Sequence, residues 1–460
     1  MNKNDVFEIE ITDMNSLGVG VGKHQDGMVV FVSGAVTGDL VRAKVIKVKP
    51  SFVVARLEEV IAPSPDRERD EFCQSPLSCG GCTFRSLKYA RELDAKRSFV
   101  RGEFIKQGLG DVEILPVAHI EGGERAYRNK AQFPIGARGG KCVGGFYSKK
   151  SHDIIPIKTC SLQPEIFSQI LAFVCAFADD AMIAPYDEER GSGILRHLFI
   201  RQAKATDEIM LTLVVRTSIA KEAAEAFARA VVERFPMIVS VMENINREKT
   251  NVILGDEYRL IYGRDYIEDI LLGRRFRISA PSFYQVNHDC AELLYSLAAR
   301  EAALTGRENL LDLYCGAGTI GLCLADRAKT LVGVEIVPQA IECAKVNAQI
   351  NGIENAHFFC ADASATEKLL ESAESSLGAL DFDVAVMDPP AKGSTPELIN
   401  YIAARKIPKV VYVSCGPDTL ARDCALFRSL GYEIGTVTPV DMFPRTGHCE
   451  CVVLMSRVDK

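Results

Sequence analysis

The second half of the chain alternates short apolar runs with longer amphipathic stretches. The apolar runs predict strands, and the amphipathic stretches predict helices because their apolar residues recur at helical spacing. We expect helices at 288–304, 318–328, 338–352, 365–375, 395–405 and 417–431, and strands at 309–316, 330–337, 356–363, 382–390 and 409–415. Strands that alternate with helices predict an α/β fold with a doubly wound parallel sheet. The last two apolar runs, 432–443 and 449–458, have no helix between them and should pair as an antiparallel hairpin.

The first 60 residues have a different pattern. Short runs rich in β-branched residues are separated by glycines and predict strands at 7–14, 27–34, 39–50 and 51–61. Several short strands with tight turns indicate a small closed β-barrel of the oligonucleotide-binding type. Basic residues in the run 39–50 fit either an RNA-contacting face or an ordinary solvated strand.

The middle of the chain mixes the two patterns. Helices are expected at 165–177 and 220–235, and strands at 195–203, 208–217, 239–246 and 274–287. A stretch with two prolines and six charges, 62–72, reads as a linker. We therefore predict three domains, in keeping with about 150 residues per domain: a barrel at 1–62, a mixed α/β central domain at 63–280 and the parallel-sheet domain at 281–460.

Composition narrows the class of protein. Hydrophobic residues make up 47% and charged residues 25% of the 460-residue chain, which is typical of globular proteins. The longest purely apolar run, Ile170 to Ala178, is too short for a membrane span, which needs about 20 residues. The N-terminal residues lack the apolar core of a secretory signal, so we expect a cytoplasmic protein without membrane association.

The charge is unevenly distributed. The whole chain carries −7, but residues 85–158 hold 15 Lys and Arg against 8 Asp and Glu, a net of +7 that leaves −14 for the rest. This asymmetry favours a nucleic-acid surface within the basic segment. A chance cluster of solvated charges is the alternative.

A glycine-rich sequence lies where the first strand of the parallel sheet meets its helix. It reads LDLYCGAGTIG at 311–321, and acidic residues end the next three strands: Glu335, Asp362 and Asp388. Ligands bind beyond the carboxyl ends of such strands, where a carboxylate can take ribose hydroxyls. The spacing of Gly316, Gly318 and the third glycine also fits NAD. The terminal hairpin and the Pro-Pro pair after Asp388 favour S-adenosylmethionine.

Cys415 ends the fifth strand, in the same row as the predicted cofactor site. Addition of a thiolate to C6 of a pyrimidine makes C5 nucleophilic enough to accept a methyl group, and a base must then remove the C5 proton. Glu450 lies at the turn of the predicted hairpin and is the candidate base, with His448 as the alternative. A buried core cysteine is the structural alternative for Cys415.

Fifteen cysteines, an odd number, without an export signal disfavour a disulfide framework. Four of them form a set, with three close in sequence and one distant: Cys73, Cys79, Cys82 and Cys160. Four thiolates without a nearby histidine suit zinc or an iron–sulfur cluster, and spacing alone does not decide between these.

Six motifs together resemble the RNA uracil-5-methyltransferases. They are CGGC at 79–82, SFYQVN at 282–287, LDLYCGAGTIGL at 311–322, DPPAKG at 388–393, YVSCGPDTLARD at 412–423 and DMFPRTGHCE at 441–450. Within that family the chain resembles the 23S ribosomal RNA branch, which has an N-terminal TRAM barrel and a [4Fe-4S] cluster. The resemblance implies a Rossmann-like S-adenosylmethionine-dependent methyltransferase domain.

The resemblance also implies roles for individual residues. The four cysteines of the set match the cluster ligands, Cys415 the nucleophile and Glu450 the base. The contacts to S-adenosylmethionine are matched by four residues: Gln285, Tyr314, Glu335 and Asp388. The family implies that the target uridine is flipped out of a folded RNA. Two positions depart from it, since the family often has Arg at Ala391 and Asn at Gly416.

We therefore predict a monomeric enzyme that makes 5-methyluridine in ribosomal RNA. Transfer RNA is the first alternative substrate; the barrel and the cysteine set favour ribosomal RNA because the transfer RNA branch usually lacks both. A cytosine-5 enzyme and a non-catalytic iron–sulfur RNA-binding protein are further alternatives. The latter would need neither Cys415 nor Glu450.

Overall fold

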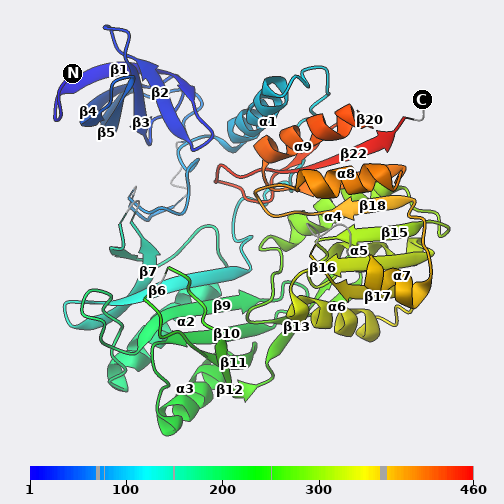
Figure 1. Cartoon of the computed structure of the whole chain (residues 1–460). Coiled ribbons are helices and arrows are strands. Elements are labelled where there is room, and N and C mark those ends of the chain that lie inside the picture. Colours follow the sequence, from blue (N-terminus) through cyan, green and yellow to red (C-terminus); the bar gives the residue numbers. More distant parts are fainter. Residues whose placement is uncertain (69–72, 77, 149–150, 250, 363–369, 459–460) are drawn as a thin grey trace.

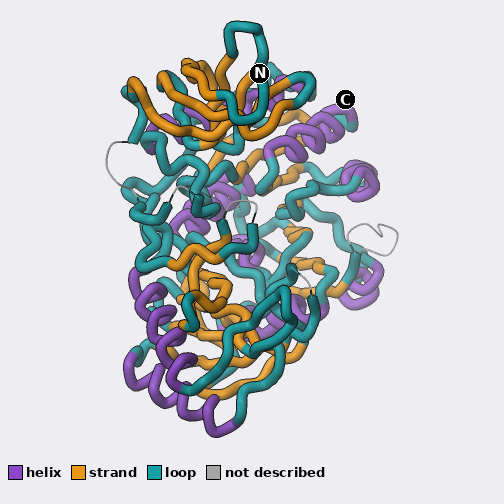
Figure 2. Tube along the Cα trace, turned by 90° about the vertical axis from the view of Figure 1, so that its left-hand side faces the viewer, coloured by secondary structure: helices purple, strands orange, loops and turns teal. Residues whose placement is uncertain are grey.

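The computed structural model describes residues 1–68, 73–76, 78–148, 151–249, 251–362 and 370–458. In Figure 1, the N-terminal barrel lies at the upper left, a central sheet with two helices lies below it, and a larger sheet with helices lies at the right. Figure 2 shows from the side that the barrel stands at one end of the molecule.

The N-terminal part is a closed five-stranded barrel in the order β1-β2-β3-β5-β4. Its strands are β1 (Val6–Met14), β2 (Val19–Lys23), β3 (Val29–Ser33), β4 (Leu40–Val48) and β5 (Phe52–Ala62). Alternate residues point inward and form its core, as with Ile9 and Ile11. The sequence pattern missed β2 because VGVGK has few large residues, and a Cβ at Gly22 would lie 2.5 Å from the Glu10 carbonyl oxygen. Of the predicted linker 62–72, residues 69–72 lie outside the described residues.

The central part is a seven-stranded sheet in the order β12-β11-β10-β9-β6-β7-β8. Its strands are β6 (Lys130–Arg138), β7 (Lys141–Tyr147), β8 (Ile154–Pro156), β9 (Leu195–Gln202), β10 (Ile209–Val215), β11 (Ile238–Ile245) and β12 (Glu257–Gly263). Helices α2 (Glu165–Asp180) and α3 (Lys221–Arg234) contribute buried apolar residues to its core. A separate pair, β13 (Tyr266–Leu271) and β14 (Arg274–Ser279), leads to the third part.

The third part is the predicted α/β domain, and its fold class is confirmed. The strands follow the order β17-β16-β15-β18-β19-β22-β20, in which β17 to β19 pair in parallel and β22 runs antiparallel to both of its neighbours, β19 and β20. The strands are β15 (Asn309–Leu313), β16 (Thr330–Glu335), β17 (Ala356–Cys360), β18 (Val384–Met387), β19 (Lys409–Ser414), β20 (Tyr432–Ile434), β21 (Thr438–Val440) and β22 (Glu450–Arg457). The predicted hairpin is present, but its first arm is divided into β20 and β21, and both pair with β22.

The helices of this part match the predicted ones. They are α4 (His288–Ala302), α5 (Thr319–Leu324), α6 (Pro338–Ile350), α7 (Glu371–Leu377), α8 (Pro396–Ala404) and α9 (Pro417–Ser429). For the helix expected at 365–375, the residues before 370 lie outside the described part of the chain.

One helix was not predicted at all. Helix α1 (Tyr89–Lys106) and the segment after it carry apolar residues such as Val100, Phe104 and Ile114 into the core of the large sheet. Ile114 and Ala118 also form bridges to β21 and the residue before it. Residues 89–118, which the sequence analysis placed in the central domain, therefore pack with the third part. No helix in the described ranges is long and apolar enough to cross a membrane.

Candidate active site and cysteine cavity

The carboxyl ends of β15, β16, β18 and β19 meet at one edge of the parallel sheet. At this edge the glycine-rich loop and the acidic strand ends lie together. The Gly316 N–H donates to Glu335 Oε2 at 3.2 Å, and the Val337 N–H donates to Glu335 Oε1 at 3.0 Å. The backbone therefore orients the Glu335 carboxylate beside the glycine loop, the arrangement expected for a ribose-binding carboxylate.

The glycine loop contains residues in the left-handed backbone conformation, which glycine adopts readily. Tyr314, Gly316 and Gly318 have positive φ angles of 62°, 54° and 78°. A Cβ at Gly321 would lie 2.5 Å from Asp312 Oδ2, which accepts the Gly321 N–H at 3.0 Å. Burial raises the pKa of Asp312 to about 8.

The other predicted cofactor residues lie around this loop. Gln285 is buried beside the Tyr295 hydroxyl. Its backbone carbonyl oxygen accepts a hydrogen bond from the Asn129 side chain at 2.9 Å. Asp362 follows β17 and is exposed. Its negative charge adds to the rise in the pKa of Tyr314 that burial causes. Asp388 follows β18, and burial raises its pKa to about 7.

Cys415 and Glu450 lie at the ends of two paired strands, close enough for their charges to interact. The last ladder pair between β19 and β22 is Ser414 with Cys451, so Cys415 and Glu450 are each one position beyond that pair. Burial, with Glu450 and Asp388 adding repulsion, raises the pKa of the Cys415 thiol to about 11. Glu450 is only 4% exposed, and burial raises its carboxyl pKa well above the ordinary value, with Asp388 adding to the shift.

His448, the alternative base, lies in the loop before β22. Its ring packs edge-on against Phe443 with the centroids 5.8 Å apart. Burial lowers its pKa, and the nearby cations of Arg128 and Lys96 lower it further. The His448 imidazole is therefore neutral near pH 7.

The two departures from the family pattern touch each other. The Thr419 hydroxyl donates to the carbonyl oxygens of Ala391 at 3.1 Å and of Gly416 at 3.0 Å. A Cβ at Gly416 would lie 2.7 Å from Thr419 Oγ1 and 3.0 Å from the Ala391 carbonyl oxygen. In this chain the turn after Cys415 therefore has room for glycine only, unless Thr419 moves.

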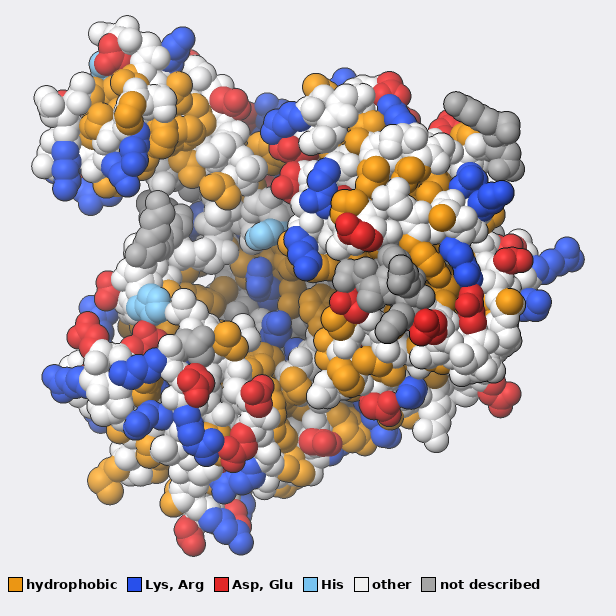
Figure 3. All heavy atoms as spheres, viewed as in Figure 1, with side chains coloured by type: hydrophobic (Ala, Val, Ile, Leu, Met, Phe, Trp, Pro, Cys, Tyr) orange, Lys and Arg blue, Asp and Glu red, His pale blue; other side chains and the backbone are white. Residues whose placement is uncertain are grey.

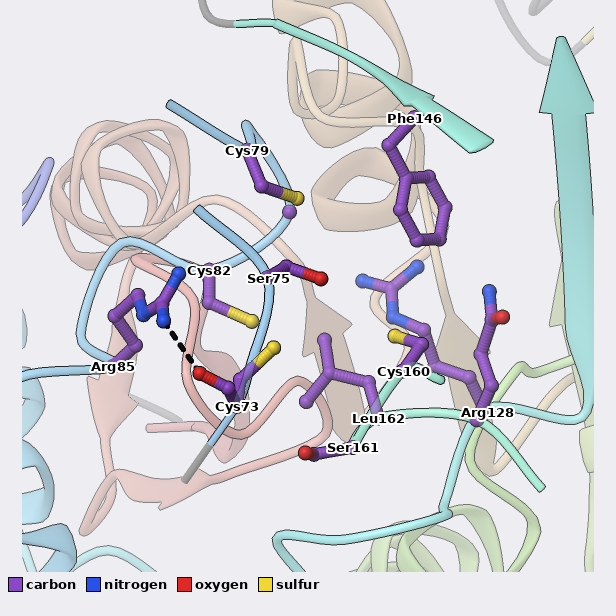
Figure 4. Close-up of a pocket in the computed structure, with 12 residues that line it drawn as sticks. Cys73, Ser75, Cys79, Cys82, Arg85, Arg128, Phe146, Cys160, Ser161 and Leu162 are labelled. Carbon is purple, nitrogen blue, oxygen red and sulfur yellow. Dashed lines mark hydrogen bonds between the residues drawn. The ribbon is translucent and has the colours of Figure 1, made fainter. Parts of the chain in front are cut away.

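The four cysteines of the predicted set line a single cavity of about 280 Å³ (Figure 4). Cys73, Cys79 and Cys82 come from the loop before α1, and Cys160 comes from the segment after β8. Arg85 and Arg128 also line the cavity. Arg85 donates to the carbonyl oxygens of Cys73 at 2.7 Å and of Pro76 at 3.1 Å, so it holds the cysteine loop in place.

The residue types that line this cavity, rather than their present spacing, suit a sulfur-ligated cluster. Among the residues that the structure describes, its lining contains four thiols and two guanidinium groups but no histidine or carboxylate. A volume of about 280 Å³ exceeds the roughly 30 Å³ share of one water molecule several times over, so it is larger than a single ion needs. Burial, with repulsion from the neighbouring cysteines, raises the pKa of Cys82 to about 12 and that of Cys160 to about 11. In the described ranges no three His, Cys, Asp or Glu side chains are close enough together to hold a metal ion.

Comparison with known proteins gives the family. The model described as tRNA (Uracil-5-)-methyltransferase matches residues 88–458, and the TRAM domain model matches residues 2–57. The chain belongs to the RNA uracil-5-methyltransferase family. It is 41% identical over 462 residues to an uncharacterized RNA methyltransferase of Clostridium acetobutylicum, covering 100% of this chain and 99% of that one. An uncharacterized RNA methyltransferase of Halalkalibacterium halodurans is 40% identical, with 99% of this chain and 98% of that one covered.

A solved structure is similar over nearly the whole methyltransferase. It is the Pyrococcus abyssi tRNA (uracil-54, C5)-methyltransferase in complex with S-adenosyl-L-homocysteine, with a TM-score of 0.76 and 26% identity. The alignment covers 97% of this chain and 99% of that chain. The protein is thus an RNA (uracil-5-)-methyltransferase that uses S-adenosylmethionine and carries a TRAM barrel.

Some cationic side chains of the basic segment, residues 85–158, are buried and help to hold the fold, and others are exposed. Lys96 is completely buried, and the Arg97 guanidinium binds the Ile114 carbonyl oxygen at 2.7 Å, so both have structural roles that the charge count could not show. Within the barrel, Arg42 pairs with Glu8 and Glu59. Around the hollow between the three parts, Figure 3 shows further Lys and Arg side chains. One partly buried lysine, Lys130, has its pKa lowered to about 8 by burial and by two neighbouring arginines.

Proposed function

We propose that the enzyme methylates C5 of a uridine in ribosomal RNA of the 23S type, with Cys415 as nucleophile and Glu450 as base. The observation that supports the two catalytic roles is the electrostatic interaction between Cys415 and Glu450, each of which lies one position beyond the last pair of the β19–β22 ladder. Their position beside Asp388 and the glycine loop brings them to the edge of the sheet where a cofactor binds.

In the proposed reaction the Cys415 thiol loses its proton to solvent, its sulfur bonds to C6 of the uracil, and the electron pair of the C5–C6 double bond moves to C5. S-adenosylmethionine, when bound, supplies the methyl group to C5. Glu450 then takes the C5 proton, the double bond re-forms, and the bond from C6 to the Cys415 sulfur breaks. The raised pKa of Glu450 suits a carboxyl group that must hold a proton during this step.

The cofactor residues have distinct proposed roles. The orientation of Glu335 by two backbone N–H groups supports its contact with the ribose hydroxyls. Gly316 and Gly318 let the backbone approach the ligand, since both have positive φ angles. The remaining contacts are proposed for residues that surround the loop: Gln285, Tyr314, Asp362 and Asp388.

We propose a [4Fe-4S] cluster as the occupant of the cysteine cavity, held by Cys73, Cys79, Cys82 and Cys160. The four-thiol lining supports it, and the two arginines offset the negative charge that four thiolates would bring. The cluster would tie the loop before α1 to the segment after β8. A structural role beside the TRAM barrel follows from this position.

Transfer RNA is the second candidate substrate. The Pyrococcus abyssi structure favours it, because that protein acts on tRNA and its likeness to this chain extends over the barrel. The barrel therefore does not by itself separate the two substrates. The cysteine cavity is the feature that favours ribosomal RNA, through the resemblance to the 23S branch.

Mass mapping of nucleosides in ribosomal and transfer RNA, from cells with and without the gene, tests the substrate. Loss of 5-methyluridine from one or two ribosomal positions is the expected result. If only transfer RNA loses the modification, the chemistry stands and the ribosomal assignment is wrong. If neither loses it, the proposed reaction is wrong for these RNAs.

A further inference from the structure

The loop that joins β21 to β22 ends at Glu450, and its backbone carbonyl oxygens accept hydrogen bonds from several other parts of the chain. Five successive carbonyl oxygens, from Asp441 to Arg445, each accept a hydrogen bond from another part of the chain. The donors are, in order, Cys290 at 3.2 Å, Asn287 at 3.1 Å, Lys96 at 3.2 Å, Tyr127 at 3.0 Å and the backbone N–H of Thr83 at 2.9 Å. The loop is thus fixed from helix α4, helix α1, the segment before β6 and the cysteine loop together.

Lys96 lies at the centre of these contacts. Its side chain is 0% exposed, and its ammonium group makes three hydrogen bonds: to Glu92 Oε1 at 2.7 Å, to Asp441 Oδ1 at 2.7 Å and to the Phe443 carbonyl oxygen at 3.2 Å. An ammonium group has three N–H donors, so each of them has a partner. No solvent reaches this group, and its orientation is set by the protein alone.

The partners of Lys96 extend the network to the rest of the loop. The second oxygen of Asp441 accepts the Tyr89 hydroxyl at 2.8 Å. Glu92 Oε1 also accepts the backbone N–H of Arg445 at 2.7 Å. Helix α1 therefore holds the loop at its first residue, Asp441, and again at Arg445.

Such a cluster is a costly way to join a helix to a loop. Burying an ammonium group and two carboxylates carries a desolvation penalty that well-packed apolar residues avoid, and the attraction between the charges does little more than offset it. The charges instead fix the relative position of the helix and the loop, because a hydrogen-bonded ion pair allows one arrangement where apolar packing allows several. The arrangement here acts on the strand pair that carries the proposed base, since Asp441 follows Val440 directly and Val440 pairs with Glu450.

We propose that Lys96 is a positioning residue for Glu450. By holding the Asp441 carboxylate and the Phe443 carbonyl oxygen, it fixes the start of the loop and, through the Val440–Glu450 pair, the place of the Glu450 carboxyl group near Cys415. This inference rests on the proposed function, in which Glu450 removes the C5 proton. A displacement of that carboxyl group slows proton removal but leaves the earlier attack by Cys415 intact.

The test is a single-turnover reaction of the full-length Lys96→Met variant with a substrate RNA that carries tritium at uridine C5. Proton release and the covalent enzyme–RNA adduct are both measured. We expect release of tritium to fall by about 100-fold, the loss typical of an ångström-scale misplacement, while the adduct accumulates and RNA affinity is unchanged. Lys106→Met is the matched control, because Lys106 is an exposed residue of the same helix and pairs with Glu103 on that helix.

The outcomes separate the inference from the function on which it rests. Glu450→Gln serves as the reference and should also trap the adduct. If Glu450→Gln traps the adduct and Lys96→Met loses adduct and product in equal proportion, Lys96 is only structural and the inference is wrong. If Glu450→Gln releases product normally, the assignment of the base is wrong, and the positioning role fails with it.

The Lys96→Met change leaves two buried carboxylates without their cation and can prevent folding. Tyr89→Phe then decides the question, because it removes a single hydrogen bond to Asp441 and keeps the charges. A smaller rise in adduct, in the same direction, supports the inference. An unchanged ratio of adduct to product in Tyr89→Phe overturns it.

Discussion

The protein places cysteine in two contrasting environments. Cys415 ends a strand of the parallel sheet beside the carboxyl groups of Glu450 and Asp388, and its pKa is raised to about 11. The cysteines of the cavity have Arg85 and Arg128 as charged neighbours, and Arg85 opposes the rise in the pKa of Cys82. The same side chain thus meets negative charge in one region and positive charge in the other.

The two charge environments suit two chemical roles of a cysteine sulfur, a nucleophile and a metal ligand. A nucleophile must bond to carbon for one part of a turnover and then be released, and negative neighbours keep the resting sulfur protonated and protected from electrophiles and oxidants. Metal ligands must remain thiolates, and neighbouring cations reduce the repulsion among them. Burial raises the thiol pKa in both regions, so the sign of the charged neighbours is what distinguishes the two environments.

The largest effect is expected from Cys415→Ala. Without the sulfur, C5 of the uracil has no route to a nucleophilic form, so turnover should fall by roughly 10⁴-fold or more. RNA affinity should stay within the range of the unaltered enzyme, because the side chain is small and lies at a strand end. Methyl transfer from labelled S-adenosylmethionine and RNA binding, measured side by side, check both expectations.

Cys175→Ala is the control for this change, since Cys175 lies on α2 in the central part. It should retain turnover. Full activity of the Cys415→Ala variant would contradict the nucleophile assignment, and it would remove one side of the contrast between the two cysteine environments.

A smaller effect on turnover is expected from Cys82→Ser, which changes a cysteine of the cavity. Loss of one of four ligands should abolish stoichiometric iron binding and lower Tm by about 5 °C or more, since binding energy at such a site contributes to folding. Turnover should fall less than in Cys415→Ala, because the cavity does not include the reacting groups. Metal analysis of anaerobically purified protein, with calorimetry, provides the measurement.

Chelation of the unaltered enzyme should reproduce the change in Tm, and Cys343→Ser, which replaces a cysteine on α6, should not. One bound zinc ion per chain in place of iron would contradict the cluster assignment. An unchanged iron content in Cys82→Ser would contradict the ligand set.

The sequence could predict the strand ends far better than the contacts that hold them. The places of Glu335, Asp388 and Cys415 follow from apolar periodicity, because parallel strands bring their carboxyl ends to one edge. Helix α1 escaped prediction because its buried face contains Glu92 and Lys96, which the pattern of apolar residues counts as exposed. Their partner Asp441 is some 345 residues away along the chain, and no local signal links them.

The cysteine set shows the same limit. Spacing pointed to four ligands, but the guanidinium groups that surround them come from positions that the charge count assigned to an RNA surface. Lys96 was counted in that surface as well, yet it is buried. A net charge over a segment does not distinguish cations that face a partner from those that fix the fold.

The smallest expected effect concerns the charge around Cys415. In the enzyme without RNA, the rate of alkylation by iodoacetamide should rise about tenfold per pH unit from pH 7 and level off near pH 11, because only the thiolate reacts. Glu450→Gln removes one repelling carboxylate, which lowers the pKa of the thiol and raises the thiolate fraction. At pH 8 we expect alkylation to be roughly 3- to 10-fold faster, the effect of half to one pKa unit.

The ratio between the two proteins should widen as Glu450 ionises and should close again above about pH 11, where the thiol is ionised in both. The pKa of Glu450 is itself raised, so at low pH its carboxyl group is neutral and resembles the Gln side chain; as it ionises, it begins to repel the thiolate in the unaltered enzyme only. Peptide-level mass spectrometry isolates Cys415 from the other 14 cysteines. Glu433→Gln, at an exposed position on β20, is the control and should leave the rate unchanged. A ratio of one at every pH would show that burial alone sets the pKa of Cys415, and the contrast in charge between the two cysteine environments would then have no chemical consequence.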